Sequence, residues 1–235
     1  MAKRVIVTGA SRGIGFELVK QYAEADYEVI AISRNAYKLE RLKEVCLNLN
    51  PQALVHTISF DLATDDLGTH LMPSINKYFN QVDVLINNAG AIVAKAFTEI
   101  SPDELQRVYS VNILSVFKLT QALMPKFSDS AHILNISSVG GVQGSVKFAG
   151  LTAYSSSKAA LVGLTECLAE EYKKTGLSFN CLALGAVQTE MLEEAFPGYQ
   201  APITAKNMAT YIVDFSLNGS KFYKGKILTV SKSTP

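Results

Sequence analysis

The chain has 235 residues, of which 48% are hydrophobic and 18% charged, and its formal net charge is +1. This near-neutral balance excludes the broad basic surface of a nucleic-acid-binding protein and suits a compact globule with a large buried core. No run approaches the ~18 apolar residues of a membrane span, and the first apolar run ends at Thr8-Gly9, too early for a signal peptide.

Apolar runs of strand length alternate along the chain with segments of helical spacing. Continuous apolar runs are typical of strands that are buried on both faces. The expected strands are 4–9, 28–33, 53–60, 82–88, 132–138, 177–184 and 226–231, and the clearest helical segments are 16–26, 36–48, 101–127 and 159–176.

Local signals mark the ends of two of these helices. Ser101 is the expected N-cap of the third, with Pro102 in its first turn and Glu104 completing a capping box. Gly176 is expected to close the fourth, after Lys173 and Lys174 in its last turn.

This alternation predicts an α/β fold: a Rossmann-type, doubly wound, seven-stranded parallel sheet with helices on both faces. We find no linker or repeat, so residues 1–235 are expected to form one domain. Ligands of such sheets bind at the carboxyl ends of the strands, which makes those ends the place to look for a site.

A glycine turn follows the first strand in "TGASRGIG", with Gly9, Gly13 and Gly15. Glycines between a buried strand and a helix let the backbone approach a diphosphate, which the helix N-terminus then binds. The spacing is GxxxGxG instead of the general GxGxxG, and a glycine turn by itself is often only a turn. Its place at the N-terminus favours dinucleotide binding.

The end of the second strand bears on the choice of cofactor. Ser33 stands where NAD-binding proteins carry an acidic residue for the ribose 2′-hydroxyl, and Arg34 follows it. Arg12 lies inside the glycine turn. Two guanidinium groups near the adenosine ribose suit the 2′-phosphate of NADP(H), although both could be solvated surface arginines.

Polar and small residues follow the third and fourth strands. Asp61 is placed to accept a hydrogen bond from an adenine amino group, or alternatively to cap the next helix. The "NNAG" turn at residues 87–90 allows a ring or a ribose to lie against the backbone, and it could equally be a tight structural turn.

The fifth strand ends in "NISSVGG", and the next helix starts with Tyr154 and Lys158 four positions apart. Residues at this spacing share a helix face, and a nearby ammonium favours the phenolate. Ser137 or Ser138 and the phenol can together bind one carbonyl oxygen. A lone YxxxK is more often a surface tyrosine beside a solvated lysine.

With these motifs in this order, together with "SVNI" around Asn112, the chain resembles the short-chain dehydrogenase/reductase family over nearly its whole length. The resemblance implies that Tyr154 is the general acid/base, that Lys158 lowers its pKa and holds the nicotinamide ribose, and that Ser138 orients the substrate oxygen. Asn112 would hold a water linked to Lys158; without the family we would prefer a buried asparagine bonded to local backbone.

The resemblance also implies the set of cofactor contacts. Thr189 would touch the nicotinamide carboxamide and, with Val187, select the ring face. The residues expected to contact NADP(H) are Gly9, Ser11, Arg12, Gly13, Ile14, Gly15, Ser33, Arg34, Asp61, Leu62, Asn88, Ala89, Gly90, Tyr154, Lys158, Val187 and Thr189.

The chain departs from the family pattern in several places. Leu184-Gly185 replaces the usual Pro-Gly, so that turn loses a fixed φ. The loop 138–154 is longer than usual, which makes Ser145 the fallback for Ser138. A short lid is expected at about 190–205, where Phe196 and Tyr199 serve as pocket walls or as packing residues. The segment 226–235 lacks the family's acidic-Gly-Gly stretch.

The leading interpretation is an NADP(H)-dependent reductase that interconverts a ketone or aldehyde with an alcohol. It would be cytoplasmic and a homodimer or homotetramer, with a small-molecule substrate and neither a nucleic-acid nor a membrane partner. The widely spaced, odd-numbered cysteines Cys46, Cys167 and Cys181 favour a reducing compartment and no metal site. The alternatives are a non-catalytic dinucleotide sensor or scaffold, and an acyl-carrier-protein ketoreductase using Lys147 and Lys206 at the pocket mouth.

Overall fold

The computed structural model describes residues 3–232. The first two residues and the last three, which include the end of the segment 226–235, lie outside the described residues. Within the described range, no helix is both long enough and apolar enough to cross a membrane.

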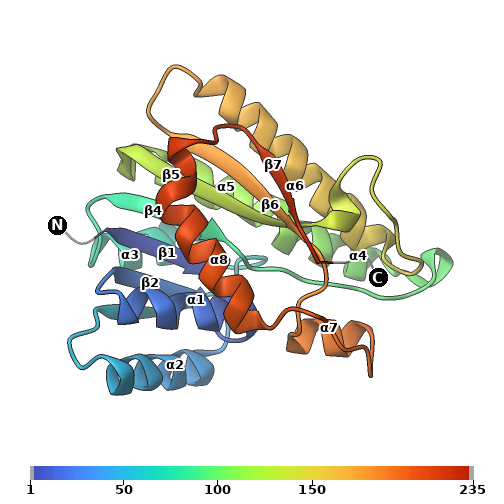
Figure 1. Ribbon diagram of the computed structural model, residues 1–235, viewed down its shortest axis with the longest axis horizontal. Coiled ribbons are helices and arrows are strands. Elements are labelled where there is room, and N and C mark those ends of the chain that lie inside the picture. The colour runs from blue at the N-terminus through green and yellow to red at the C-terminus, as the bar shows by residue number, and fades with distance from the viewer. Residues whose placement is uncertain (1–2, 233–235) are drawn as a thin grey trace.

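The seven predicted strands all form, in one parallel sheet with the order β3-β2-β1-β4-β5-β6-β7 (Figure 1). The order reverses between β1 and β4, which is where ligands bind in sheets of this type. The strands are β1 (Arg4–Thr8), β2 (Glu28–Ser33), β3 (Val55–Ser59), β4 (Val82–Asn87), β5 (Phe127–Ser138), β6 (Ser178–Leu184) and β7 (Ile227–Val230).

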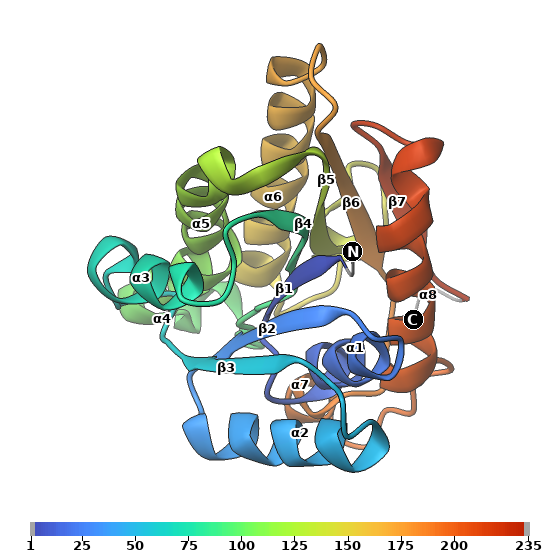
Figure 2. The same cartoon turned by 90° about the vertical axis from the view of Figure 1, so that its left-hand side faces the viewer.

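Helices cover both faces of the sheet (Figure 2). The first layer comprises α1 (Gly13–Glu24), α2 (Ala36–Leu49) and α8 (Ala205–Asn218), and the second α3 (Met72–Asn76), α4 (Pro102–Tyr109), α5 (Ser115–Leu123) and α6 (Thr152–Glu171). The short α7 (Glu190–Ala195) follows β6 at the sheet's carboxyl edge.

Alternate residues of the strands β1 to β6 pack into two separate hydrophobic cores, one on each face of the sheet. In β1, Val5 and Val7 pack with the layer of α1, α2 and α8, whereas Ile6 packs with the opposite layer. Because successive side chains point to opposite faces, a strand buried on both sides needs an unbroken apolar run. This is the reason that the apolar runs predicted the strands.

The predicted helix 101–127 exists but is not continuous. The capping box of Ser101 and Glu104 is present and opens α4. A π-helical turn, Ser110–Leu114, then separates α4 from α5, and a 3-10 turn, Met124–Lys126, follows before β5 begins. Pro125 lacks the N–H that would continue α5, so the helix ends earlier than predicted.

The sequence predicted that Gly176 ends the helix 159–176, and this prediction is wrong. Helix α6 ends at Glu171, and Gly176 lies beyond it. A Cβ at Gly176 would clash with the backbone oxygen of Asp129, at the start of β5. The glycine is therefore required by a close approach of two chain segments and not by a helix cap.

Buried polar side chains tie the sheet to α6. Asn87 of β4 donates to Asn135 of β5 at 2.8 Å, and Asn135 donates to Thr165 of α6 at 2.9 Å. All three side chains are buried. Paired polar side chains inside a core specify one arrangement of the elements that carry them, so these bonds help to set how α6 packs against the sheet.

Candidate active site

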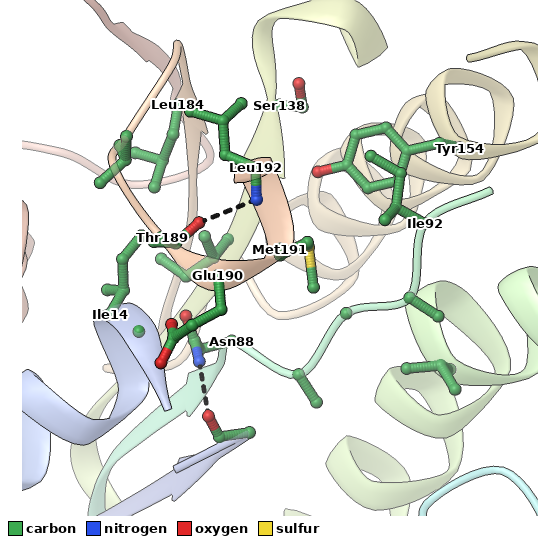
Figure 3. A pocket seen from close by; sticks show the side chains of 18 of the residues that line it. Ile14, Asn88, Ile92, Ser138, Tyr154, Leu184, Thr189, Glu190, Met191 and Leu192 are labelled. Atoms are coloured by element: carbon green, nitrogen blue, oxygen red, sulfur yellow. Dashed lines mark hydrogen bonds between the residues drawn. The ribbon is translucent and has the colours of Figure 1, made fainter. Parts of the chain in front are cut away.

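One cavity of about 330 Å³ opens at the carboxyl ends of the strands and collects most of the predicted residues (Figure 3). Every residue predicted to bind cofactor or substrate lines it, except Gly15 and Asn112. Sequence segments from the glycine turn near the N-terminus to the lid near residue 199 meet here.

The glycine turn forms one end of the cavity. Gly9 and Gly13 have φ values of +69° and +56°, in the left-handed region that favours glycine. A Cβ on Gly15 would clash with the carbonyl oxygen of Gly9 and lie 2.7 Å from Asn88 Nδ2. Helix α1 begins here without a side-chain cap or an acidic residue in its first turn, so its N–H groups suit a diphosphate.

The "NNAG" turn is locked to the end of β1. Thr8 Oγ1 accepts hydrogen bonds from the backbone N–H groups of Asn88 and Ala89 at 3.0 and 3.1 Å. The Asn88 side chain donates to the Thr8 carbonyl at 3.0 Å. The turn is thus the tight structural turn considered above, and it also lines the cavity.

Three charged side chains meet at the ends of β2 and β3. Asp61 Oδ2 lies 3.8 Å from Arg34 and 3.7 Å from Arg107, which comes from α4. The other carboxylate oxygen of Asp61 accepts the N–H of Ala63 at 2.9 Å. Ser33 donates to Ser11 at 2.7 Å and faces the same end of the cavity.

Arg12 reaches from the glycine turn to the lid. Its guanidinium group forms a two-pronged ion pair with Glu194 of α7, with Nη2 and Oε2 3.1 Å apart. The hydrogen bond with Arg12 holds the pKa of the Glu194 carboxyl below its usual value. A residue predicted to bind phosphate therefore has a carboxylate partner in this structure.

The phenol of Tyr154 and the hydroxyl of Ser138 face one another at the other end of the cavity (Figure 3). Lys158 lies one turn along α6, is 3% exposed, and donates from Nζ to the carbonyl of Ile136 at 2.7 Å. Its Nζ is 5.9 Å from the centre of the Tyr154 ring. The shared helix face predicted from the four-residue spacing is confirmed.

The predicted lowering of the Tyr154 pKa is not found. Burial raises the pKa of Tyr154 to about 12, and hydrogen bonding with Ser138 opposes this to a smaller extent. Burial also lowers the pKa of Lys158 to about 8. Both shifts come mainly from removal of the groups from water, because a buried charge loses its hydration.

The buried lysine leads to a prediction about stability. Because the pKa of Lys158 falls from its ordinary 10.5 to about 8, its charge disfavours the folded state. Lys158→Met should raise the free energy of unfolding by about 1–3 kcal/mol at pH 7. This gain in the free energy of unfolding should be complete below pH 8 and should disappear above pH 10.5.

Urea unfolding of both proteins at several pH values measures that difference. Lys118→Met is the matched control, since Lys118 is an exposed lysine on α5. A pH-independent difference, or a loss of stability in Lys158→Met, would contradict the burial argument.

Asn112 lies in the π-helical turn and uses its whole amide group locally. Its Oδ1 accepts from the N–H of Ala91 at 2.8 Å, and its Nδ2 donates to the Ala91 carbonyl and to Ser157 at 2.9 Å each. It is fully buried. The bonds to local backbone match the alternative that the sequence left open, and the bond to Ser157 ties this turn to α6.

Comparison with known proteins supports the family resemblance found in the sequence. The model of the family described as short chain dehydrogenase matches residues 3–200. An uncharacterized oxidoreductase of Staphylococcus saprophyticus is 31% identical over 211 residues, which are 88% of each chain. The chain belongs to the short-chain dehydrogenase/reductase family.

Two further relatives cover almost all of this short-chain dehydrogenase. The 3-oxoacyl-[acyl-carrier-protein] reductase of Chlamydia trachomatis is 28% identical over 97% of this chain and 95% of its own. The crystal structure of a short chain dehydrogenase from Escherichia coli complexed with NADPH has a TM-score of 0.88 and 30% identity, over 97% of this chain and 95% of that one.

The long loop of this family member leaves Ser138 in the cavity and turns Ser145 away. Ser145 donates to the carbonyl oxygens of Val139 and Val142, and it does not line the cavity. Ser138 lines the cavity and ends β5. The loop start packs directly on α6, since a Cβ at Gly141 would lie 2.7 Å from the backbone of Lys158.

The replacement of Pro-Gly by Leu184-Gly185 is compensated by packing. Gly185 N–H bonds to the carbonyl of Val230 at 3.0 Å, and a Cβ on Gly185 would clash with Ser231. The neighbouring strand β7 therefore holds the turn in place of a fixed proline φ.

The expected lid segment, at about 190–205, is closed at its base. Gln188 N–H bonds to the Ile203 carbonyl at 2.8 Å, and the Gln188 side chain accepts from Ala201 at 2.8 Å. Phe196 and Tyr199 both line the cavity, as pocket walls would.

Sequence reasoning missed Arg107 and Glu194 in this short-chain dehydrogenase. Both residues lie on helices whose charged side chains are expected to face solvent, and neither belongs to a local sequence motif. Each reaches its partner, Asp61 or Arg12, across a long sequence separation.

Proposed function

We propose that this protein is an NADP(H)-dependent oxidoreductase that interconverts a ketone or aldehyde with an alcohol, and that residues 1–235 act as one domain with a lid at about 190–205. The observation that carries the proposal is the convergence of the Ser138 hydroxyl and the Tyr154 phenol in the cavity that also contains the glycine turn. The bound cofactor supplies or accepts the hydride.

The protein's own groups supply orientation and the proton. In reduction, Ser138 and Tyr154 both donate hydrogen bonds to the substrate oxygen, and Tyr154 transfers its phenol proton to that oxygen as negative charge develops. Lys158 lies beside the phenol ring and supports the phenolate that results. Asn112 holds the turn at Ala91 against α6 and would carry a water near Lys158.

The donor set fits NADP(H). The glycine turn suits a diphosphate, and Arg12, Arg34 and the neighbouring Arg107 line the cavity where no acidic residue follows β2 directly. The Escherichia coli relative binds NADPH.

The substrate end of the cavity is apolar. Among the charged residues that line the cavity, only Lys158 lies beside Tyr154, while the others gather at the glycine turn and the ends of β2 and β3. The apolar residues that line the cavity include Ile92, Val139, Phe148, Leu151, Met191 and Phe196. We therefore propose an apolar ketone or aldehyde as substrate, because additional polar groups on a substrate would find no hydrogen-bond partner on these walls.

NADPH oxidation measured against matched apolar and polyhydroxylated ketones tests this proposal. Turnover of apolar members at a kcat/KM about tenfold or more above that of the hydroxylated ones is the expected result, since each unpaired hydroxyl costs about 1–3 kcal/mol. Preference for hydroxylated ketones would refute the proposal of an apolar substrate. NADPH binding without any turnover would favour the alternative of a non-catalytic dinucleotide sensor.

The carrier-protein alternative has weaker support. Lys147 Nζ donates to the carbonyl of Val142 at 2.6 Å within its own loop, and neither Lys147 nor Lys206 lines the cavity. The Chlamydia relative is named as an enzyme of that class, so an acyl-carrier thioester belongs in the substrate panel.

We further propose that the protein is a homodimer or homotetramer. Helices α4 and α5 and the turn between them expose Leu105, Leu114 and Phe117 on one outer layer. The molar mass in solution, measured by light scattering, tests this.

A further inference from the structure

Helix α7 places Glu190 and Met191 on the wall of the cavity (Figure 3), and it carries Glu194 beside the cavity-lining Arg12. A Cβ on Gly13 would lie 3.5 Å from Glu190 Oε2, and a Cβ on Gly90 would lie 3.7 Å from Met191 Cε. Glu194 holds the guanidinium group of Arg12.

These three contacts differ in kind. Glu190 and Met191 approach glycine backbones with the ends of long side chains, which can turn away about their own bonds. The pair of Arg12 and Glu194 instead joins the glycine turn to the lid through two charge-assisted hydrogen bonds. It is the contact that ties the lid helix to the phosphate-binding loop.

A guanidinium group also suits phosphate, whose oxygens it can bind through paired N–H groups. The neighbouring Arg34 already faces Asp61 at 3.8 Å, and Arg107 faces the same carboxylate, so both share a partner on the protein. A 2′-phosphate at this end of the cavity would therefore compete with the Glu194 carboxylate for Arg12.

We propose that Glu194 is a cofactor-specificity residue, whose carboxylate the 2′-phosphate of NADP(H) displaces from Arg12, so that the phosphorylated dinucleotide alone frees the lid from the glycine turn. The inference rests on the proposed cofactor. NAD(H) has no group that competes for Arg12, and it leaves the ion pair in place.

The pair is partly exposed, with 35% of the Arg12 side chain and 59% of the Glu194 side chain accessible. Ion pairs of this exposure are weak, so the competition should change affinity by only about two- to fivefold. That range is large enough to measure by titration.

Glu194→Gln separates this proposal from a merely structural role. The variant should bind NADP⁺ and adenosine 2′,5′-bisphosphate about two- to fivefold more tightly, with unchanged affinity for NAD⁺ and adenosine 5′-monophosphate. Calorimetric titration needs no turnover. Equal effects on both pairs of ligands, or no effect on either, would overturn the proposal.

Glu193→Gln is the matched control, because it removes the same charge from the same helix. Glu193 accepts the N–H of Gly198 at 3.0 Å, a bond that the amide oxygen of glutamine can keep. This variant should bind all four ligands as the parent protein does. A gain for NADP⁺ equal to that of Glu194→Gln would show that lid charge in general, and not the Arg12 contact, is responsible.

A tryptophan on the lid reports its release directly. The chain has no tryptophan, so Phe196→Trp introduces a single tryptophan. Adenosine 2′,5′-bisphosphate should shift its emission and adenosine 5′-monophosphate should not, and adding Glu194→Gln should produce the shifted spectrum before any ligand is present. Identical responses to the two nucleotides would contradict the proposal.

Failure of the proposed function gives a different result. If the parent protein binds neither NADP⁺ nor adenosine 2′,5′-bisphosphate, the cofactor assignment is wrong. If it binds both and Glu194→Gln changes nothing, only the role of Glu194 is wrong.

Discussion

Tyr154→Phe is expected to lower kcat for carbonyl reduction by about 10²–10⁴-fold, the usual contribution of a positioned proton donor. The variant keeps the ring that packs in the cavity beside Lys158 and removes only the phenol oxygen that faces Ser138. Affinity for NADPH should change little, because the glycine turn and the arginines are unaltered. Single-turnover oxidation of NADPH, with binding measured separately, checks both expectations.

Tyr109→Phe is a close control for this variant. Tyr109 of α4 donates its phenol hydrogen bond to Ser156 of α6 at 3.0 Å, outside the cavity. Its loss should leave kcat nearly unchanged. If Tyr154→Phe kept the parent rate, Tyr154 would not be the proton donor and the proposed mechanism would fail.

Gly15→Ala is expected to weaken NADPH binding by about tenfold or more and to destabilise the fold by about 1–3 kcal/mol, as overpacking does. A methyl group there would clash with the carbonyl of Gly9 and lie 2.7 Å from Asn88 Nδ2. Relief of the clash must shift either the glycine turn or the side chain that locks β4 to β1. Both movements distort the surface that faces the diphosphate.

Gly163→Ala provides the comparison for that glycine. Gly163 lies within α6, and a Cβ there would meet no atom within 4 Å. Alanine in a helix interior should stabilise the protein by about 1 kcal/mol and leave NADPH affinity unchanged. Titration of NADPH and urea unfolding of both variants give the two quantities. If Gly15→Ala bound NADPH normally, the close approach at the glycine turn would not matter for the cofactor.

The strands and the start of α4 could be predicted because their signals are local. The inner strands are buried on both faces, which requires an unbroken apolar run within a few residues. The capping box joins Ser101 and Glu104 three positions apart, and the structure contains it. The interruption of the helix 101–127 has no such signal, because Asn112 and its turn are held by contacts with Ala91 and Ser157.

The proposed reaction centre could also be predicted from the sequence, for a related reason. Tyr154 and Lys158 share a helix face by spacing alone, and Ser138 ends a strand whose neighbours are set by the alternation of elements. The direction of their pKa shifts could not be predicted from the sequence. The pKa values of Tyr154 and Lys158 depend mainly on burial, which arises from segments packed over them.

The sequence by itself determined the family, the seven-stranded sheet and many of the residues that line the cavity, because each of these follows from short-range spacing and the order of motifs. Only the tertiary structure decided that Gly176 serves a close approach to Asp129, and that Arg12 is paired with Glu194 of the lid. Such contacts join positions far apart in the chain. Their energy depends on how whole elements pack, and no window of neighbouring residues records it.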